Sequence, residues 1–458
     1  MTARNGPAVA SLSSRDESHS MKYVMGEAKQ TKRRAELFRY VALEVSETTL
    51  RGTFELDGKT FVESVTFEGV RSLEAPEVTA VAQLWFLLAG LSYYKAGAAR
   101  RVDVGSTPLG IKGQALLEAA LRDGLAEFAF RNDLSLADVL ITGGVATTTY
   151  TPQVDPERVL IPFGGGVDSV VTTTELATHL ERSLFVVSPA SGRFAPLEAT
   201  AAVTELDLVR ATRVLDDQIL RDDDSLFKGH VPVTAMVTLL AAVAALASGR
   251  GGVVMSNEHS ASLANLRWRD LDVNHQWSKS WDAEQLLGEA LSERVGPEFV
   301  VASFLRDRSE VWVNRAFSQL TTFHHVFRSC NRAFNQVLEQ RLDTWCGVCD
   351  KCLFTNLMLA PYLPRATLRE IFQHEPLSDP AREAQLRVLV GAGLDFKPFE
   401  CVGDPNESAV ALVKVSQRAE WGDVEILATL ANEVTPDRTF EELLEPQGPS
   451  RVPAHWLR

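Results

Sequence analysis

The feature that most restricts the possible folds of this chain is a glycine-rich turn between an apolar run and a helical stretch. The apolar run covers residues 159–163, the turn is Gly164-Gly165-Gly166, and the helical stretch runs from Ser169 to His179. Glycines let the backbone turn sharply and come close to a ligand. The free N–H groups at the start of the following helix then face an anion, assisted by the helix dipole. We interpret the turn as a phosphate site, with a plain glycine turn of a doubly wound fold as the alternative.

Strand-like and helical stretches alternate through the middle of the chain. The apolar runs at 159–163, 184–187 and 253–255 are typical of strands, and helical stretches lie between them. This alternation favours βαβ units, in which a parallel sheet carries helices on both faces. The uncharged run 231–248 has the length of a short membrane span, but it lacks aromatic belts and basic flanks. We therefore expect a buried helix there.

The pattern divides the rest of the chain into three further parts. Residues 1–35 have few large apolar side chains and are predicted to form a disordered tail. Residues 36–150 combine strand-like runs around an Asp57-Gly58 turn with two amphipathic helical stretches, at 78–97 and 111–131, which predicts an α+β domain. Residues 151–360 would form the phosphate-binding domain, and 361–458 a helical region. The predicted fold class is α/β, a doubly wound parallel sheet with these two additions.

Composition argues against several classes of protein. The chain has 458 residues, with 60 acidic and 46 basic side chains and a formal net charge of −14. This balance disfavours a protein whose main partner is nucleic acid or an anionic membrane. Five cysteines are too few for a disulfide scaffold, and the N-terminus shows no secretory signal. We expect a cytoplasmic protein of several domains that acts on a small molecule.

A polar segment follows the apolar run 253–255. Ser256, Asn257 and Glu258 come directly after this run. The carboxyl ends of parallel strands are where ligands bind in open α/β sheets, so this segment is a candidate part of the site. Glu258 would act there as a base or as a magnesium-side acid, and an ordinary polar loop is the alternative.

A second polar segment places a histidine and a lysine close together. His275 and Lys279 lie in Val273-Asn274-His275-Gln276-Trp277-Ser278-Lys279-Ser280. Such groups can be tuned for proton transfer near neutral pH. A surface loop with ordinary hydrogen bonds is the alternative, and His230 in front of the run 231–248 has the simpler interpretation of a helix cap.

Four of the five cysteines have the spacing C-x15-C-x2-C-x2-C. They are Cys330, Cys346, Cys349 and Cys352. Tight CxxC spacing lets two thiolates reach one metal, and four sulfurs satisfy tetrahedral zinc. In a reducing compartment a metal is favoured over disulfides, so we predict a structural zinc. An iron–sulfur cluster and ordinary buried thiols are the alternatives.

The fifth cysteine, Cys401, stands apart from this cluster in the segment 397–403. A lone cysteine is usually a small apolar core residue. As a thiolate it would instead handle a proton at a carbon acid. Both interpretations are open from the sequence.

The turn and the residues after it, Gly164 to Ser169, resemble the SGGxDS signature of the PP-loop ATP pyrophosphatases. These enzymes split ATP between the α- and β-phosphates. The resemblance implies a PP-loop fold and ATP with magnesium as cofactors, with Asp168 on the magnesium side. Gly164 stands where the family usually has Ser, which removes one hydroxyl from the phosphate site. The residues implied to bind ATP are Gly164, Gly165, Gly166, Asp168, Ser169, Ser256 and Asn257.

Five motifs taken together resemble one PP-loop family over about residues 36–420. They are GGGVDS, SNEHSA, VNHQWSKS, CGVCDKC and PFECVG, and the family is that of the UDP-N-acetylmuramoyl-L-alanyl-L-glutamate epimerases (MurL). The resemblance implies conversion of the terminal L-Glu of UDP-MurNAc-L-Ala-L-Glu into D-Glu, for peptidoglycan synthesis. ATP would activate the carboxylate as an acyl-adenylate, with release of AMP and diphosphate. The catalytic candidates are Lys279, His275, Glu258 and Cys401.

Three other functions are compatible with the same motifs. A PP-loop enzyme that modifies tRNA would need a basic groove, which the net charge of −14 disfavours. An ATP-dependent ligase or deazaguanine nitrile synthase would have the cysteine cluster near its site, and some PP-loop enzymes that make deazaguanine nitriles carry a similar cysteine-ligated zinc. A regulatory protein that binds nucleotide without turnover would keep the fold alone.

Overall fold

The computed structural model describes residues 32–221, 223–334, 341–393 and 396–458. Residues Arg34–Arg458 form one compact unit. The predicted tail at 1–35 lies almost wholly outside the described residues.

Ten strands of the described residues form one sheet, in the order β12-β9-β6-β7-β8-β3-β2-β1-β4-β5. These strands are β1 (Leu37–Val45), β2 (Thr49–Leu56), β3 (Lys59–Glu68), β4 (Arg101–Asp103), β5 (Leu140–Thr142), β6 (Asp155–Pro162), β7 (Glu181–Pro189), β8 (Leu208–Val214), β9 (Arg250–Met255) and β12 (Val300–Ser303). A separate small hairpin pairs β10 (Leu266–Trp268) with β11 (Leu271–Val273).

The five strands β8-β7-β6-β9-β12 are all parallel to one another. Numbered along the chain, their spatial order is 3-2-1-4-5, the order of a doubly wound sheet. Successive side chains of a strand face opposite sides of a sheet. Accordingly, Val159 and Ile161 of β6 lie in one apolar core, and Leu160 between them lies in the other. The α/β prediction with a mostly parallel sheet is confirmed.

The N-terminal strands extend the same sheet. Strands β1, β2 and β3 form an antiparallel meander, and β3 pairs with β8 in antiparallel fashion. The predicted Asp57-Gly58 turn is confirmed, because both residues have positive φ, at 46° and 84°. Such a turn matches the twist of a hairpin. Strands from both sides of residue 150 therefore share one sheet, and the domain limits given above stay predictions.

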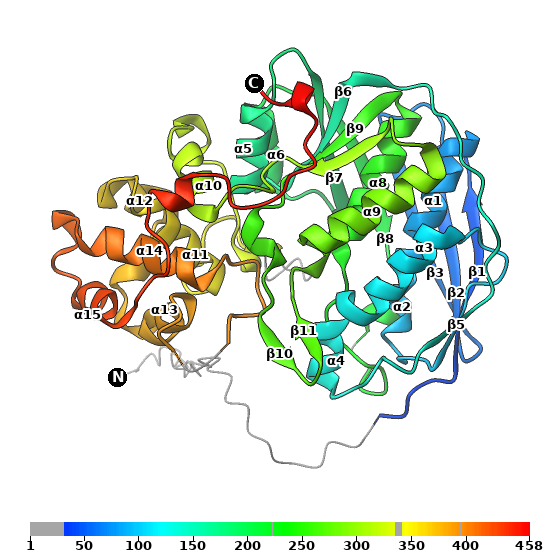
Figure 1. Ribbon diagram of the computed structural model, residues 1–458, viewed down its shortest axis with the longest axis horizontal. Coiled ribbons are helices and arrows are strands. Elements are labelled where there is room, and N and C mark those ends of the chain that lie inside the picture. The colour runs from blue at the N-terminus through cyan, green and yellow to red at the C-terminus, as the bar shows by residue number, and fades with distance from the viewer. Residues whose placement is uncertain (1–31, 222, 335–340, 394–395) are drawn as a thin grey trace, which may run out of the picture. The chain divides into compact units, whose positions relative to one another are not determined.

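Helices cover both faces of the sheet. They are α1 (Pro76–Ala89), α2 (Leu91–Tyr94), α3 (Gly110–Ala119), α4 (Ala126–Asn132), α5 (Val167–Glu175), α6 (Ala195–Val203), α7 (Asp217–Leu220), α8 (Val233–Ala247), α9 (Trp281–Val295), α10 (Glu310–Ser318), α11 (Asp350–Leu359), α12 (Arg365–Phe372), α13 (Glu383–Leu389), α14 (Pro405–Ser416) and α15 (Glu425–Glu433). Helices α1, α8 and α9 share one core, and α5, α10 and α11 share the other. In Figure 1 the helices α11 to α15 gather away from strands β1 to β3.

The run 231–248 forms the buried helix that its composition predicts. Helix α8 packs on α1 and on strands β6 and β9, and its side chains from Leu239 to Ala245 have no exposed area. Within the described residues no helix is both long and apolar enough to cross a membrane.

Candidate active site

The ends of two neighbouring strands define the ligand-binding edge of the sheet. Strand β6 leads into α5, which lies in one core, and β9 leads toward α9, which lies in the other. The chain therefore changes face between β6 and β9, which is the topological switch point of the sheet. Ligands of doubly wound sheets bind in the crevice beyond the strand ends at this point. Both polar segments predicted from the sequence, the glycine turn and residues 256–258, follow these two strands.

The glycine turn is closely approached by another part of the chain. Gly165 has φ of +70°, a conformation that other residues rarely adopt. Its carbonyl oxygen accepts a hydrogen bond from the backbone N–H of Arg328, at 3.1 Å. A Cβ on Gly166 would lie 2.6 Å from Oγ of Ser329, whereas a Cβ on Gly164 would meet nothing within 4 Å. The turn thus needs glycine at 165 and 166, and it is open at 164.

Three carboxylates come together beyond the strand ends. Asp168 lies in the first turn of α5, Glu258 follows β9, and Glu310 begins α10. Burial and the charge of Glu258 raise the pKa of Asp168 to about 6. Burial and the charges of Asp168 and Glu258 raise the pKa of Glu310 well above its usual value. Like charges held close together destabilise one another unless a cation joins them, and oxygen ligands of this kind suit Mg²⁺.

A small cavity of about 10 Å³ lies between two of these acids, Asp168 and Glu310, and helix α11. It is lined by Val167, Asp168, Glu310, Asn314, Ser329, Lys351, Phe354 and Thr355. Lys351 lies between Cys349 and Cys352 of the four-cysteine cluster, so the fold of the cluster places the Lys351 ammonium group at the cavity wall. Glu310 and Lys351 are not among the site residues predicted from the sequence.

Several buried polar atoms around this edge lack a hydrogen-bond partner among the described residues. They are Oγ of Ser256, Oδ1 of Asn314, Nζ of Lys397 and Oε2 of Glu400. Buried polar groups are nearly always partnered in native structures, and an unpaired ammonium is especially costly. The Lys397 side chain is 6% exposed, and burial lowers its pKa. These groups are therefore available to bind a polar ligand.

Other predicted ATP-site residues are engaged within the protein. The Ser169 hydroxyl donates to the carbonyl oxygen of Gly166 at 3.1 Å. The Asn257 amide donates to Oγ of Ser303 at 3.0 Å. These two side chains therefore stiffen the edge in the described state, and Ser256 is the residue of this group with a free hydroxyl.

One buried arginine ties the two polar segments together. Arg306, 1% exposed, pairs with Glu284 through Nε at 3.0 Å and Nη2 at 2.9 Å. It also donates to the carbonyl oxygens of Glu258, at 2.9 Å, and of Lys279, at 2.6 Å. The sequence offers no signal for this role, because the arginine lies far along the chain from the residues it holds.

We expect Arg306→Ala to lower the free energy of unfolding by about 3–5 kcal/mol, because it leaves Glu284 buried without its partner. Urea denaturation of purified protein measures this change. The control is Arg267→Ala, which breaks the pair of Arg267 with Asp272, whose side chains are 67% and 66% exposed. That change should cost at most about 1 kcal/mol. Equal effects of the two substitutions would contradict this account of Arg306.

Three of the four catalytic candidates meet at one point. Lys279 donates from Nζ to Sγ of Cys401 at 3.3 Å, and His275 also hydrogen-bonds Cys401. The fourth candidate, Glu258, interacts with Lys279 through its charge. Burial raises the pKa of Glu258, but the positive charge of Lys279 lowers it. Nδ1 of His275 lies 2.5 Å from Oε2 of Glu127, a residue of α4. Nothing in the sequence marks Glu127, which is one acid on an ordinary amphipathic helix.

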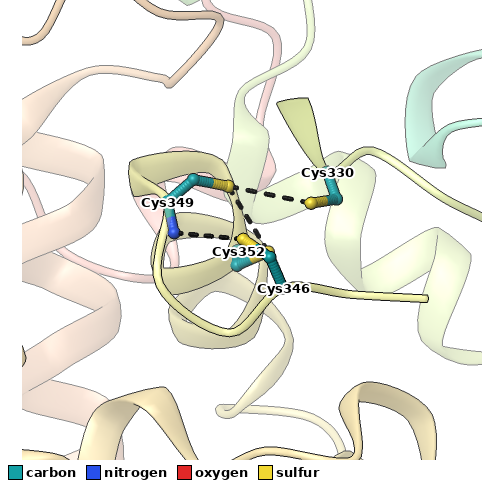
Figure 2. Close-up of side chains that lie close together, drawn as sticks. All are labelled: Cys330, Cys346, Cys349 and Cys352. Atoms are coloured by element: carbon teal, nitrogen blue, oxygen red, sulfur yellow. Dashed lines mark hydrogen bonds between the residues drawn. The ribbon is translucent and has the colours of Figure 1, made fainter. Parts of the chain in front are cut away.

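The four-cysteine cluster has the geometry of a metal site. Its sulfur atoms all lie within 4.8 Å of one another, and Figure 2 shows them facing a common centre. Sγ of Cys349 lies 3.4 Å from that of Cys352 and 4.0 Å from that of Cys330, and those of Cys346 and Cys352 are 3.6 Å apart. Four sulfurs at about 2.3 Å from a tetrahedral zinc lie about 3.8 Å from one another. The donor set and its spacing therefore fit zinc.

Comparisons with known proteins match most of the chain. The family model of the MurL N-terminal domain matches residues 29–304, and that of the MurL C-terminal domain matches residues 326–443. The chain is 37% identical over 389 residues to the UDP-N-acetyl-alpha-D-muramoyl-L-alanyl-L-glutamate epimerase of Salinispora tropica, covering 82% of each chain. The protein of that name from Micromonospora sp. is 36% identical, over 82% of this chain and 85% of its own. The one from Xanthomonas oryzae pv. oryzae is 33% identical, over 92% of this chain and 96% of its own. No solved structure is detectably similar.

Proposed function

Because the chain belongs to the MurL family of epimerases, we propose that it converts the terminal L-Glu of UDP-MurNAc-L-Ala-L-Glu into D-Glu at the expense of ATP. In this proposal ATP transfers AMP to the α-carboxylate of the glutamate. The resulting acyl-adenylate is epimerised and then hydrolysed, and AMP and diphosphate are released. The product is a precursor for peptidoglycan.

The observation that carries the proposal is the grouping of unsatisfied polar atoms beyond β6 and β9. The open glycine turn, three carboxylates and the unpartnered ammonium of Lys397 lie at this edge. A polyphosphate with a divalent cation would satisfy both signs of charge at once. The strand order 3-2-1-4-5 and the turn after its first strand support a PP-loop fold for this half.

The chemistry of the substrate explains why such an epimerase would need ATP. The α-proton lies beside a carboxylate, whose negative charge opposes formation of a carbanion. Pyridoxal phosphate solves this problem through an imine with a free amine, but here the nitrogen is tied up in a peptide bond. Adenylation removes the carboxylate charge and lets the carbonyl stabilise an enolate. Each pKa unit gained at carbon is worth about 1.4 kcal/mol.

The position of each residue suggests its role in binding ATP or in proton transfer. The backbone N–H groups of the glycine turn and Lys351 hold the phosphates. Asp168 and Glu310 would hold the magnesium ion, which when bound neutralises phosphate charge. Lys279, His275, Glu258 and Cys401 are the candidates for adenylate stabilisation and proton transfer. The four-cysteine cluster holds a structural zinc, which keeps Lys351 at the cavity.

Chiral analysis of the product tests the proposal. Purified protein is incubated with UDP-MurNAc-L-Ala-L-Glu, magnesium and ATP, and the acid-hydrolysed glutamate is resolved into its two enantiomers. We expect D-Glu only when ATP is present, with AMP formed alongside it. UDP-MurNAc-L-Ala, which lacks the glutamate, is the control and should yield no AMP. ADP in place of AMP, or no D-Glu with an active nucleotide site, would contradict the proposal.

A further inference from the structure

We infer that Cys401 is the base that removes the α-proton from one face, and that Glu127 positions His275 to keep Cys401 a thiolate. This inference rests on the proposed function and deepens it by giving individual roles. It also adds Glu127 to the site, a residue that the sequence pattern does not indicate.

The arrangement joins three segments that are distant in the chain. Glu127 is 4% exposed and lies on α4, His275 precedes the 3₁₀ turn Trp277–Lys279, and Cys401 lies in the loop before α14. Oε2 of Glu127 accepts from Nδ1 of His275 at 2.5 Å, which leaves Nε2 of the ring for Cys401. Arg131 donates to the other oxygen of Glu127 at 2.6 Å. A carboxylate, an imidazole and a thiol thus form one chain of hydrogen bonds.

Backbone contacts hold this chain of groups in place. The backbone N–H of His275 donates to Oδ1 of Asn265 at 2.8 Å. The side-chain amide of Gln276 donates to the carbonyl oxygen of Val402 at 3.1 Å. The side-chain amide of Asn265 donates in turn to the carbonyl oxygens of Lys397 and Pro398, at 3.1 Å and 2.6 Å. The loops of His275 and Cys401 are therefore tied to each other on both sides of the contact. A residue that acts through another needs such fixed geometry.

The charges around Cys401 favour its thiolate. Burial alone would raise its pKa, but the charge of Lys279, the hydrogen bond from His275 and the charge of Lys351 lower it to about 5. Burial lowers the pKa of His275, but its bonds to Cys401 and Glu127 raise it to about 9. Between about pH 5 and pH 9 the pair is therefore a thiolate with an imidazolium. The other charged groups that interact with the thiolate are Asp168, Lys397 and Glu400. The ring of His230 lies 4.3 Å from the ring of His275, tilted by 41°.

This charge state distinguishes Cys401 from the two basic side chains that contact it. Lys279 and His275 are both protonated at neutral pH, since the pKa of each is raised, so neither accepts a proton. The thiolate does. In the step, the α C–H bond breaks, the proton forms an S–H bond at Cys401, and the electron pair passes into the enolate of the acyl-adenylate. A thiolate is the basic form of cysteine, and the half-buried side chain of Cys401 leaves it accessible to a substrate.

Alkylation of the free protein tests the positioning role of Glu127 without any substrate. The rate at which iodoacetamide modifies Cys401 is followed by peptide mass spectrometry from pH 5 to pH 9. In the wild type the rate should already be near its plateau at pH 6. In Glu127→Gln it should fall by about tenfold at pH 6 and recover at high pH, because the imidazolium loses its partner. Glu127→Asp, which keeps the charge, should lie between them, and Glu118→Gln on the exposed face of α3 should match the wild type.

Turnover then tests the role of Cys401. We expect Cys401→Ala to form D-Glu about a hundredfold more slowly or worse, while substrate-dependent AMP release stays within about tenfold of the wild type. Retained AMP release also shows that this variant is folded. A wild-type rate of D-Glu formation by Cys401→Ala would overturn the inference, and so would an unchanged alkylation profile of Glu127→Gln. A wild type that forms no AMP would instead overturn the proposed function, and the alkylation result would still decide on Glu127.

Discussion

Replacing Asp168 with asparagine is expected to lower substrate-dependent release of AMP and diphosphate by about a thousandfold. The substitution keeps the size of the side chain but removes the charge that would hold a divalent cation against the phosphates. Asp168 lies directly after the glycine turn, in the first turn of α5, next to the N–H groups that would face the phosphates. A coupled assay for diphosphate measures the rate, with saturating UDP-MurNAc-L-Ala-L-Glu, ATP and magnesium.

The control for this experiment is Asp272→Asn, the same chemical change on the small hairpin at an exposed position. It should leave the rate unchanged. The comparison with Cys401→Ala separates the two halves of the reaction, since that variant should still release AMP. Diphosphate release by Asp168→Asn at the wild-type rate would contradict the assignment of the phosphate site.

Loss of the metal from the four-cysteine cluster is the second change with a large expected effect. Cys352 is fully buried and begins the apolar face of α11, which packs on α10 and α14. Apparent binding free energies of structural zinc are about 10 kcal/mol or more, and much of that free energy stabilises the fold around the ligands. We expect Cys352→Ser, or treatment with a strong chelator, to lower the midpoint of thermal unfolding by about 10 °C or more.

The same change should also abolish turnover, because Lys351 lies between two of the cysteines and lines the cavity beside Asp168. Zinc content by elemental analysis and thermal unfolding are measured on the same samples. The matched control is Cys401→Ser, which changes a cysteine outside the cluster and should retain the metal. A metal-free protein with wild-type stability and AMP release would show that the cluster is not a structural metal site.

The sequence predicts the local features of this protein well, because they depend on neighbouring residues. The glycine turn, the buried helix at 231–248 and the hairpin turn at Asp57-Gly58 are confirmed, since each follows from composition and backbone conformation within a short segment. The helical stretch at 111–131 is less regular than its pattern predicts. A π-helical turn, Ala120–Gly124, interrupts it between α3 and α4.

What the sequence does not reveal depends on contacts between distant segments. The pairing of β3 with β8, which joins the N-terminal strands to the parallel half, has no local signal. The same holds for Arg306 and Glu127, which act on residues more than twenty positions away. The meeting of His275, Lys279 and Cys401 is compatible with the sequence prediction, which named all three but could not place them side by side. Their catalytic roles stay predictions.

Transfer of ¹⁸O from the substrate to AMP tests the central claim most directly. The substrate is prepared with ¹⁸O in the α-carboxylate of its L-Glu, and the AMP formed in ordinary water is examined by mass spectrometry. If that carboxylate attacks the α-phosphorus of ATP and water later opens the acyl-adenylate at carbon, AMP carries one ¹⁸O for each D-Glu produced. AMP free of label while D-Glu accumulates would contradict activation of the glutamate carboxylate by ATP.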